Sequence, residues 1–236
     1  DADALKPMAK EALFRIASQT KAITSVGVMM LLEEGKLLLT DPVSKYIPAF
    51  AKPVVLDKFN AADSSYTTVP AKREITIKDL LTHTSGLGYA QIGSPTMNAI
   101  YAKNQITAGI GELKANLPET MARLGKAPLE YQPGMRWNYS LSSDVLGYVI
   151  EVVSGMSLEA FFQQRLFAPL GMKDTHFNVP ASKHSRLTAL NTQDSLGSWH
   201  KIPDSPDFPA SFPNQTTSYF SGGAGLTSTA LDYGIF

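Results

Sequence analysis

The sequence predicts one globular domain of mixed α and β structure, in which helices predominate. The chain has 236 residues, of which 44% are hydrophobic and 18% are charged. That is enough apolar material to bury a core, and too little charge for a disordered chain. Helix start and stop signals recur along the chain, whereas we expect β-rich stretches only near residues 73–77 and 187–190. No internal repeat and no Gly/Ser linker divides the sequence.

The first expected helix begins near Ser18 and is apolar on nearly every side, which is typical of a helix that lies in the core. Its apolar residues are Ile23, Val26, Val28, Met29, Met30, Leu31 and Leu32. The stretch DPVSKYIP then predicts a second helix. Asp41 can cap it, Pro42 suits its first turn, and Pro48 stops it.

The stretch TIKDLLTHTSGLG predicts a helix that begins with a capping box. Thr76 and Asp79 have the spacing of this motif, and Gly86 marks the expected stop. Two other regions have weak periodicity and scattered Gly, Pro, Ser or Asp, so we expect loops or lids at residues 88–132 and 191–221.

Two consecutive helices are expected between these loops. Gly155 ends the first, Ser157 caps the second, and Pro169 ends the second. The apolar face of the first consists of Val145, Leu146, Val149, Ile150 and Val153. The apolar face of the second consists of Leu158, Phe161, Phe162, Leu166 and Phe167.

Composition and missing motifs argue against several classes of function. Twenty-one basic residues balance twenty-one acidic ones, which argues against nucleic acid as a partner. The chain has no cysteine, and no apolar run is long enough to span a membrane. Its four histidines form no His-x-x-x-His pair, and neither a phosphate-binding loop nor a Gly-x-Ser-x-Gly elbow occurs. We therefore expect no metal and no cofactor.

Ser18 and Lys21 form the first candidate for chemistry. Residues three apart on a helix share a face, about 5–6 Å apart at Cβ, so the lysine amine can reach the serine oxygen. A serine is a weak nucleophile without a base, and burial disfavours the charged form of lysine. A second Ser-x-x-Lys, Ser198 to Lys201, lies in the Pro-rich loop with no apolar helix behind it, and chance matches to so short a pattern are common.

Two tyrosines are candidates for a third group. Tyr139 comes just before the helix at SSDVLGYVIEVV, and beside a lysine ammonium it could serve as general base. A half-buried aromatic role is the alternative for this residue. Tyr219 is its rival, because it precedes a glycine-rich turn at Gly222 and Gly223 where backbone could approach a ligand.

Four segments together resemble the serine β-lactamase-related proteins, which include class C β-lactamases, penicillin-binding DD-peptidases and β-lactamase-fold esterases. They are LFRIASQTKAITSVGVMMLLEEGKLLLTDPVSKYIP, ITIKDLLTHTSGL, PGMRWNYSLSSDVLGYVIEVVSG and RLFAPLGMKDT, and SGGAGLTSTALDY is similar further on. The resemblance implies Ser18 as acylated nucleophile, Lys21 as its partner base and Tyr139 as the start of the second motif. It also implies an α/β sandwich with a mostly helical subdomain, and an active site between the two.

The second motif departs from the β-lactamase pattern. The family commonly has Tyr-x-Asn or Ser-x-Asn, whereas here YSL places Leu141 where an asparagine would contact a β-lactam amide. The resemblance therefore favours the esterase branch. We expect Leu141, Tyr219, Gly222 and Gly223 to contact the substrate. The third motif, Lys-Thr-Gly or its variants, is not found in these residues.

The expected function is a carboxylesterase that acts on short-chain esters through an acyl-enzyme at Ser18. The alternatives are a β-lactamase or D-alanyl-D-alanine peptidase, and a non-catalytic penicillin-recognising module. The substrate would be a small ester or amide. The oligomeric state is left open, and a periplasmic or secreted location is favoured over the cytoplasm. Because the third motif and the family's strands before Ser18 are missing, we expect residues 1–236 to be one domain that lacks part of its central sheet at both ends.

Overall fold

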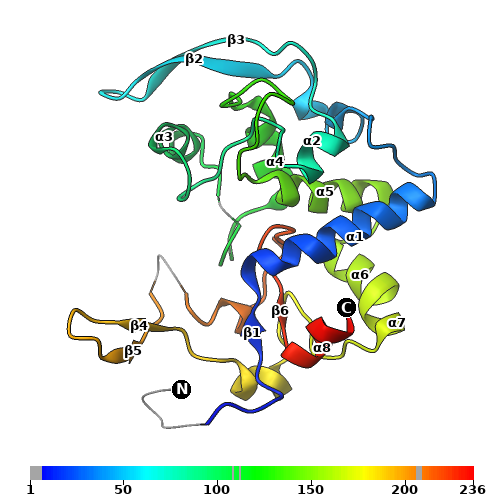
Figure 1. The fold of residues 1–236 in the computed structure, drawn as a ribbon, viewed down its shortest axis with the longest axis vertical. Coiled ribbons are helices and arrows are strands. Elements are labelled where there is room, and N and C mark those ends of the chain that lie inside the picture. The colour runs from blue at the N-terminus through cyan, green and yellow to red at the C-terminus, as the bar shows by residue number, and fades with distance from the viewer. Residues whose placement is uncertain (1–6, 108, 112, 206–208) are drawn as a thin grey trace.

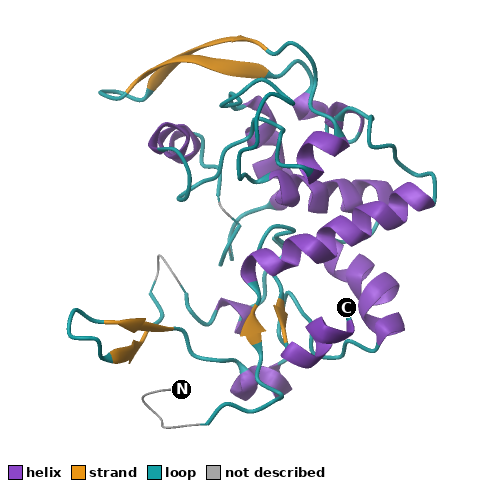
Figure 2. Cartoon of the chain, in the orientation of Figure 1, coloured by secondary structure: helices purple, strands orange, loops and turns teal. Residues whose placement is uncertain are grey.

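The computed structural model describes residues 7–107, 109–111, 113–205 and 209–236. The helix α1 (Thr20–Glu33) crosses the middle of the molecule and separates two groups of elements, as Figure 1 shows. One group contains α2, α3, α4, α5 and the hairpin of β2 and β3. The other contains α6, α7, α8, the β1–β6 pair and the hairpin of β4 and β5. Helices account for most of the regular structure and the strands are short (Figure 2).

The strands of the described residues form three antiparallel pairs. These are β1 (Phe14–Arg15) with β6 (Thr227–Ser228), β2 (Val54–Asn60) with β3 (Ser65–Pro70), and β4 (Asn191–Gln193) with β5 (Trp199–Lys201). The expected β-rich stretches at 73–77 and 187–190 were wrong. Thr76 and Leu187 form isolated bridges only. The backbone N–H of Thr76 is instead bound by the Asp79 side chain, so it is not free to join a ladder.

The helices follow some of the sequence signals closely. They are α1, α2 (Ile77–Leu81), α3 (Pro95–Lys103), α4 (Leu117–Lys126), α5 (Ser142–Ser154), α6 (Leu158–Phe162), α7 (Ala168–Leu170) and α8 (Ala230–Ile235). The Thr76–Asp79 capping box is present, Gly155 ends α5 in the left-handed conformation, and the Ser157 side chain caps α6.

Several helix boundaries differ from the sequence prediction. α2 ends at Leu81 rather than near Gly86, and residues 88–132 are not a loop, because they contain α3 and α4. A π-helical turn at Gln163–Phe167 carries the helix through Pro169. Gly171, in the left-handed conformation, ends it instead.

The stretch DPVSKYIP also differs from its prediction, since it forms no α-helix. It contains the 3-10 turn Val43–Lys45, and Pro48 begins a second 3-10 turn, Pro48–Phe50, rather than stopping a helix. The side chain of Asp41 does not cap the first turn. It accepts hydrogen bonds from Leu38, Lys45 and Tyr46 instead.

The core of the molecule forms where α1 packs against α5 and α6. Gly27 permits this contact, since a Cβ there would lie 3.0 Å from Ile150 and 3.1 Å from Phe162. α1 lies in the core as predicted, through Ile23, Val28 and Leu31, but it is not buried on every side. Val26 and Met29, on its other side, are 37% and 41% exposed. In the described part of the chain no single helix is long and apolar enough to cross a membrane, although the bent pair Ser142–Ser154 and Leu158–Leu170 passes on length and composition.

Candidate active site

Three predicted side chains meet at the N-terminal end of α1. Ser18 lies in the 3-10 turn Ala17–Gln19 that leads into α1, and Lys21 lies in the first turn of the helix. The hydroxyl oxygens of Ser18 and Tyr139 are 2.5 Å apart, and Lys21 Nζ donates to Ser18 Oγ at 3.2 Å. Lys21 Nζ also lies 4.7 Å from the centre of the Tyr139 ring. The serine oxygen is thus in hydrogen-bond contact with a phenol and an amine at once.

Tyr139 is held in place from a distant part of the chain. The amide of Asn138 donates to the carbonyl of His83, and the amide of Leu141 donates to the carbonyl of Gly88. The Tyr139 ring stacks on Tyr89, with centroids 5.4 Å apart and an angle of 6° between the planes. These contacts fix the position of the Tyr139 hydroxyl independently of Ser18.

His83 also packs against the Tyr139 ring. Their ring centroids are 5.2 Å apart, and His83 Nδ1 lies 3.2 Å from the hydroxyl of Ser140. Burial, with a contribution from the positive charge of Lys21, lowers the pKa of His83 to about 4. The imidazole is therefore neutral near pH 7 and adds no charge to the site.

The glycine-rich turn contacts α1 through its carbonyl groups. The carbonyl of Gly223 accepts from Lys21 Nζ at 2.8 Å, and the carbonyl of Gly222 accepts from Thr24 Oγ1 at 2.7 Å. A Cβ at Gly222 would lie 2.5 Å from the carbonyl oxygen of Ser143, so a larger residue does not fit there. The turn therefore holds the lysine.

The backbone N–H groups of this turn are already occupied. The amide of Gly223 donates to Asp144 Oδ1, and the amides of Ala224 and Gly225 donate to the hydroxyl and the carbonyl of Ser221. These three amides are therefore not available as oxyanion donors in this structure. The carbonyls of Gly222 and Gly223 bind α1, and the expected contact of these two residues with the substrate stays a prediction.

Asp144, in the first turn of α5, is a buried carboxylate behind the turn. Its Oδ1 accepts from Ser221 Oγ at 2.5 Å and from the amide of Gly223 at 3.1 Å. Burial raises the pKa of Asp144, while these hydrogen bonds and the charge of Lys21 act in the opposite direction. Asp144 is not among the site residues expected from the sequence.

The structure does not place two expected substrate contacts at the surface of the site. Leu141 is completely buried in the hydrophobic core, so the prediction that it contacts the substrate was wrong. It lies at the start of α5 and faces the interior of the helical group. Tyr219 is 3% exposed and packs against Gly109, where a Cβ would lie 2.9 Å from its ring. The rival serine, Ser198, lies in the exposed β4–β5 hairpin rather than on a helix.

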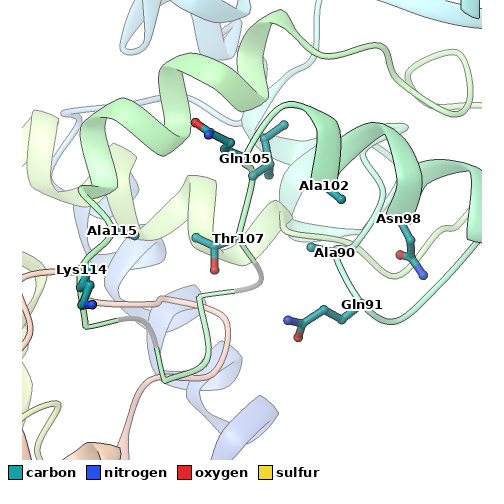
Figure 3. Close-up of a pocket in the computed structure, with 9 residues that line it drawn as sticks. Ala90, Gln91, Asn98, Ala102, Gln105, Thr107, Lys114 and Ala115 are labelled. Atoms are coloured by element: carbon teal, nitrogen blue, oxygen red, sulfur yellow. The ribbon is translucent and has the colours of Figure 1, made fainter. Parts of the chain in front are cut away.

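A cavity of about 640 Å³ is lined by residues of α3 and of the segments on either side of it (Figure 3). Ala90 and Gln91, which line it, directly follow the Tyr89 that stacks on Tyr139. Its polar lining residues are Gln91, Asn98, Gln105, Thr107 and Lys114. Among the described residues, the buried Oδ1 of Asn98 has no hydrogen-bond partner. The cavity is therefore lined by groups that could bind a polar ligand.

Comparison with known proteins identifies the family. The beta-lactamase family model matches residues 1–236. The chain belongs to the β-lactamase family. It is 39% identical to protein Rv1367c of Mycobacterium tuberculosis over 99% of this chain, and 39% identical to esterase EstB of Burkholderia gladioli over 98% of it. The chain spans 55% and 58% of the length of these two relatives.

Structural comparison agrees with this family membership. The structure matches that of EstCE1, described as a hydrolase with promiscuous acyltransferase activity, with a TM-score of 0.82 and 30% identity. The match covers 99% of this chain and 60% of EstCE1. These findings confirm the predicted β-lactamase-like α/β fold class. Within the described residues, however, the strands form two-stranded sheets in place of the larger sheet that the resemblance implies.

Proposed function

We propose that the protein is a serine hydrolase that cleaves short-chain carboxylic esters through an acyl-enzyme at Ser18. One observation carries the proposal: Ser18 Oγ lies 2.5 Å from Tyr139 Oη and 3.2 Å from Lys21 Nζ. A hydroxyl with a base in contact, which is itself held by other groups, is the arrangement that activates a serine nucleophile. The relatives named above include an esterase and a hydrolase, which supports the same class.

The first chemical step forms the acyl-enzyme. Ser18 Oγ attacks the ester carbonyl while its proton passes to the phenolate of Tyr139, which is the nearer of the two groups in contact with Ser18. The Lys21 ammonium lies over the same ring and stabilises the phenolate form from which this proton transfer starts. The backbone N–H of Ser18, at the N-terminal end of α1, is a donor for the developing oxyanion. The C–O bond breaks, and Tyr139 returns the proton to the leaving alcohol.

The second step releases the acid. Tyr139 takes a proton from a water molecule that attacks the acyl carbonyl, and the proton then returns to Ser18 as the acyl–oxygen bond breaks. Because Tyr139 protonates the leaving oxygen, the alcohol part of the ester lies on the Tyr139 side of the site. The cavity is lined by Ala90 and Gln91, which directly follow the Tyr89 that stacks on Tyr139, and we assign it to the alcohol part of the substrate.

The second motif favours an ester over a β-lactam. The buried Leu141 offers no amide to a substrate. The side-chain amide of the neighbouring Asn138 donates to the carbonyl of Leu87 and to the carboxylate of Glu130, so it does not replace the missing contact. A site that lacks a polar partner discriminates against substrates that need one. We therefore expect a higher kcat/KM for 4-nitrophenyl acetate or butyrate than for nitrocefin, and the opposite order would assign the protein to the β-lactamases.

Replacement of the nucleophile tests the proposal directly. In the full-length protein, Ser18→Ala should abolish both ester hydrolysis and labelling by a fluorophosphonate probe. Ser198→Ala is the matched control, because it removes the other serine of a Ser-x-x-Lys pattern from an exposed hairpin, and it should leave both unchanged. Labelling that persists in Ser18→Ala would refute the assignment of Ser18. A wild-type protein without any labelling would support the non-catalytic module instead.

Acyl transfer to an alcohol is a second candidate, favoured by the described activity of EstCE1. The same acyl-enzyme can react with an alcohol in place of water, and the proposed alcohol site would hold the acceptor. Product analysis in the presence of a primary alcohol separates the two. Formation of the new ester at the expense of the free acid indicates transfer, and its absence leaves hydrolysis.

A further inference from the structure

The strongest feature that the proposed mechanism does not use is the buried carboxylate of Asp144. Its Oδ1 accepts two hydrogen bonds, from Ser221 Oγ at 2.5 Å and from the amide of Gly223 at 3.1 Å. Its Oδ2 is buried and has no hydrogen-bond partner among the described residues. A Cβ at Gly223 would lie 2.4 Å from Oδ2, so the carboxylate is packed directly against the turn.

The residue that Asp144 holds is the one that binds the lysine. Gly223 donates its N–H to Asp144 and accepts from Lys21 Nζ at 2.8 Å through its carbonyl. The adjacent carbonyl of Gly222 accepts from Thr24 Oγ1 at 2.7 Å, one helical turn beyond Lys21. A continuous chain of hydrogen bonds therefore runs from α5 through the turn to α1 and ends at Ser18.

We propose that Asp144 is a positioning residue for the reaction. It fixes the Gly222–Gly223 turn so that the carbonyl of Gly223 holds the Lys21 ammonium against Ser18, and its negative charge offsets that of the ammonium. This inference rests on the proposed function of Ser18, Lys21 and Tyr139. Asp144 contacts neither the substrate nor Ser18, so it acts through Lys21.

The charge of Asp144 is difficult to explain by the fold alone. Removal of a carboxylate from water is costly, and a turn can be held by a neutral amide with the same acceptor geometry. Burial raises the pKa of Asp144, and the charge of Lys21, on the other side of Gly223, opposes this effect together with the two hydrogen bonds and so favours the carboxylate. Asp144 and Lys21 together thus place a positive charge beside Ser18, while the carboxylate stays out of contact with Ser18.

Asp144→Asn in the full-length protein tests this role, because asparagine retains an acceptor for Ser221 and Gly223 but lacks the charge. We expect the variant to fold, with KM for 4-nitrophenyl butyrate within about twofold of wild type. Misplacement of the catalytic lysine should lower kcat by about 10- to 100-fold. The pH profile of kcat should also shift, because the variant removes a negative charge close to the hydrogen bond between Lys21 and Gly223.

Asp232→Asn is the matched control. Asp232 is also a buried carboxylate that accepts from a backbone amide, that of Asp174 at 2.7 Å, and from a hydroxyl, that of Thr175 at 3.0 Å, but it lies on α8 outside the site. Its variant should keep the wild-type kcat and pH profile. If Asp144→Asn does not fold, Ser221→Ala, which removes one of the two donors and keeps the charge, decides the question by kcat: a lower kcat supports the inference and a wild-type kcat overturns it.

Two results would overturn the inference. One is a wild-type kcat, within about twofold, and an unshifted pH profile in folded Asp144→Asn. The other is an equal loss of kcat in Asp144→Asn and Asp232→Asn, which would indicate a general structural effect. Failure of the proposed function is recognised separately, since wild-type protein would then show no Ser18-dependent ester hydrolysis at all.

Discussion

Replacement of Tyr139 by phenylalanine separates its chemical role from its packing role. The ring of Tyr139 stacks on Tyr89 at 5.4 Å and lies 5.2 Å from His83, and phenylalanine keeps both contacts. The substitution removes one hydroxyl, at 2.5 Å from Ser18 Oγ. We therefore expect the free energy of unfolding to fall by no more than about 0.5–1.5 kcal/mol, the net value of one hydrogen bond.

The effect of this substitution on the reaction should be much larger. General-base assistance is worth about 100- to 10,000-fold, so kcat for 4-nitrophenyl butyrate should fall by that factor, which corresponds to about 2.7–5.5 kcal/mol of activation free energy. KM should change little, because the hydroxyl acts on the proton of Ser18 rather than on the bound ester. Steady-state kinetics and urea unfolding of the same preparations measure the two effects.

Lys21 provides the second arm of the test. If Lys21 and Tyr139 act as a unit on Ser18, the double variant Lys21→Met/Tyr139→Phe should be no more than about tenfold slower than the slower single variant, because effects within a catalytic unit are not additive. Tyr148→Phe is the control, since Tyr148 lies on α5 and has no contact with Ser18 in the structure. Activity of Tyr139→Phe within about threefold of wild type would refute the assignment of Tyr139 as base.

Two further predictions concern the surroundings of the site. The pKa of His83 is lowered to about 4 in the folded protein against 6.5 when unfolded, so the free energy of unfolding should fall as the pH drops from 6.5 to 4. Urea unfolding measures this fall, which should be smaller in His83→Asn. Asparagine is chosen because His83 has φ +54°, which asparagine tolerates; equal slopes for the two proteins would contradict the prediction. Asn98→Leu should lower the ratio of kcat/KM for 4-acetoxybenzamide to that for 4-methylphenyl acetate, since both give the same acetyl-enzyme and differ in the polar end of the alcohol. The ratio should be unchanged in Lys103→Met, which alters an exposed residue of the same helix outside the cavity lining, and a ratio unaffected by Asn98→Leu would remove the cavity from the substrate site.

The contact between the proposed nucleophile and its lysine could be predicted from the sequence because its signal is local. Ser18 and Lys21 are three residues apart on one helical segment, and this spacing alone brings their side chains together. The choice of Tyr139 over Tyr219 required the resemblance, since 121 residues separate Tyr139 from Ser18. Asp144 has no local signal at all: its partners Ser221 and Gly223 are 77 and 79 residues away, and the sequence pattern assigns it to the first turn of an apolar helix.

Some of the incorrect predictions could have been avoided, because the sequence contains signals for the structure that is observed. The region 88–132 contains Ser94 and Asn116, each of which caps a helix with its side chain and is followed within two residues by a proline. That combination is typical of a helix start, so α3 and α4 could have been predicted. The error at Leu141 had no such signal. The side chain of Leu141 faces the core or the site according to the path of the backbone between Tyr139 and α5. Tertiary hydrogen bonds to residues 83–88 fix that path.

Backbone strain gives an independent indication of where the function lies. Six non-glycine residues of the described chain have positive φ, namely Ala17, Lys52, Ser64, His83, Gln91 and Gln105. Ala17 directly precedes Ser18, and His83 packs on Tyr139, while Gln91 and Gln105 both line the cavity. A residue in this conformation costs about 1–3 kcal/mol and persists only where the surrounding structure enforces it. A fold that served stability alone would have no reason to collect four such positions around one serine and the adjoining cavity. Their concentration there supports a single site, in which the backbone before Ser18, the aromatic support of Tyr139 and the walls of the cavity are positioned together for one substrate.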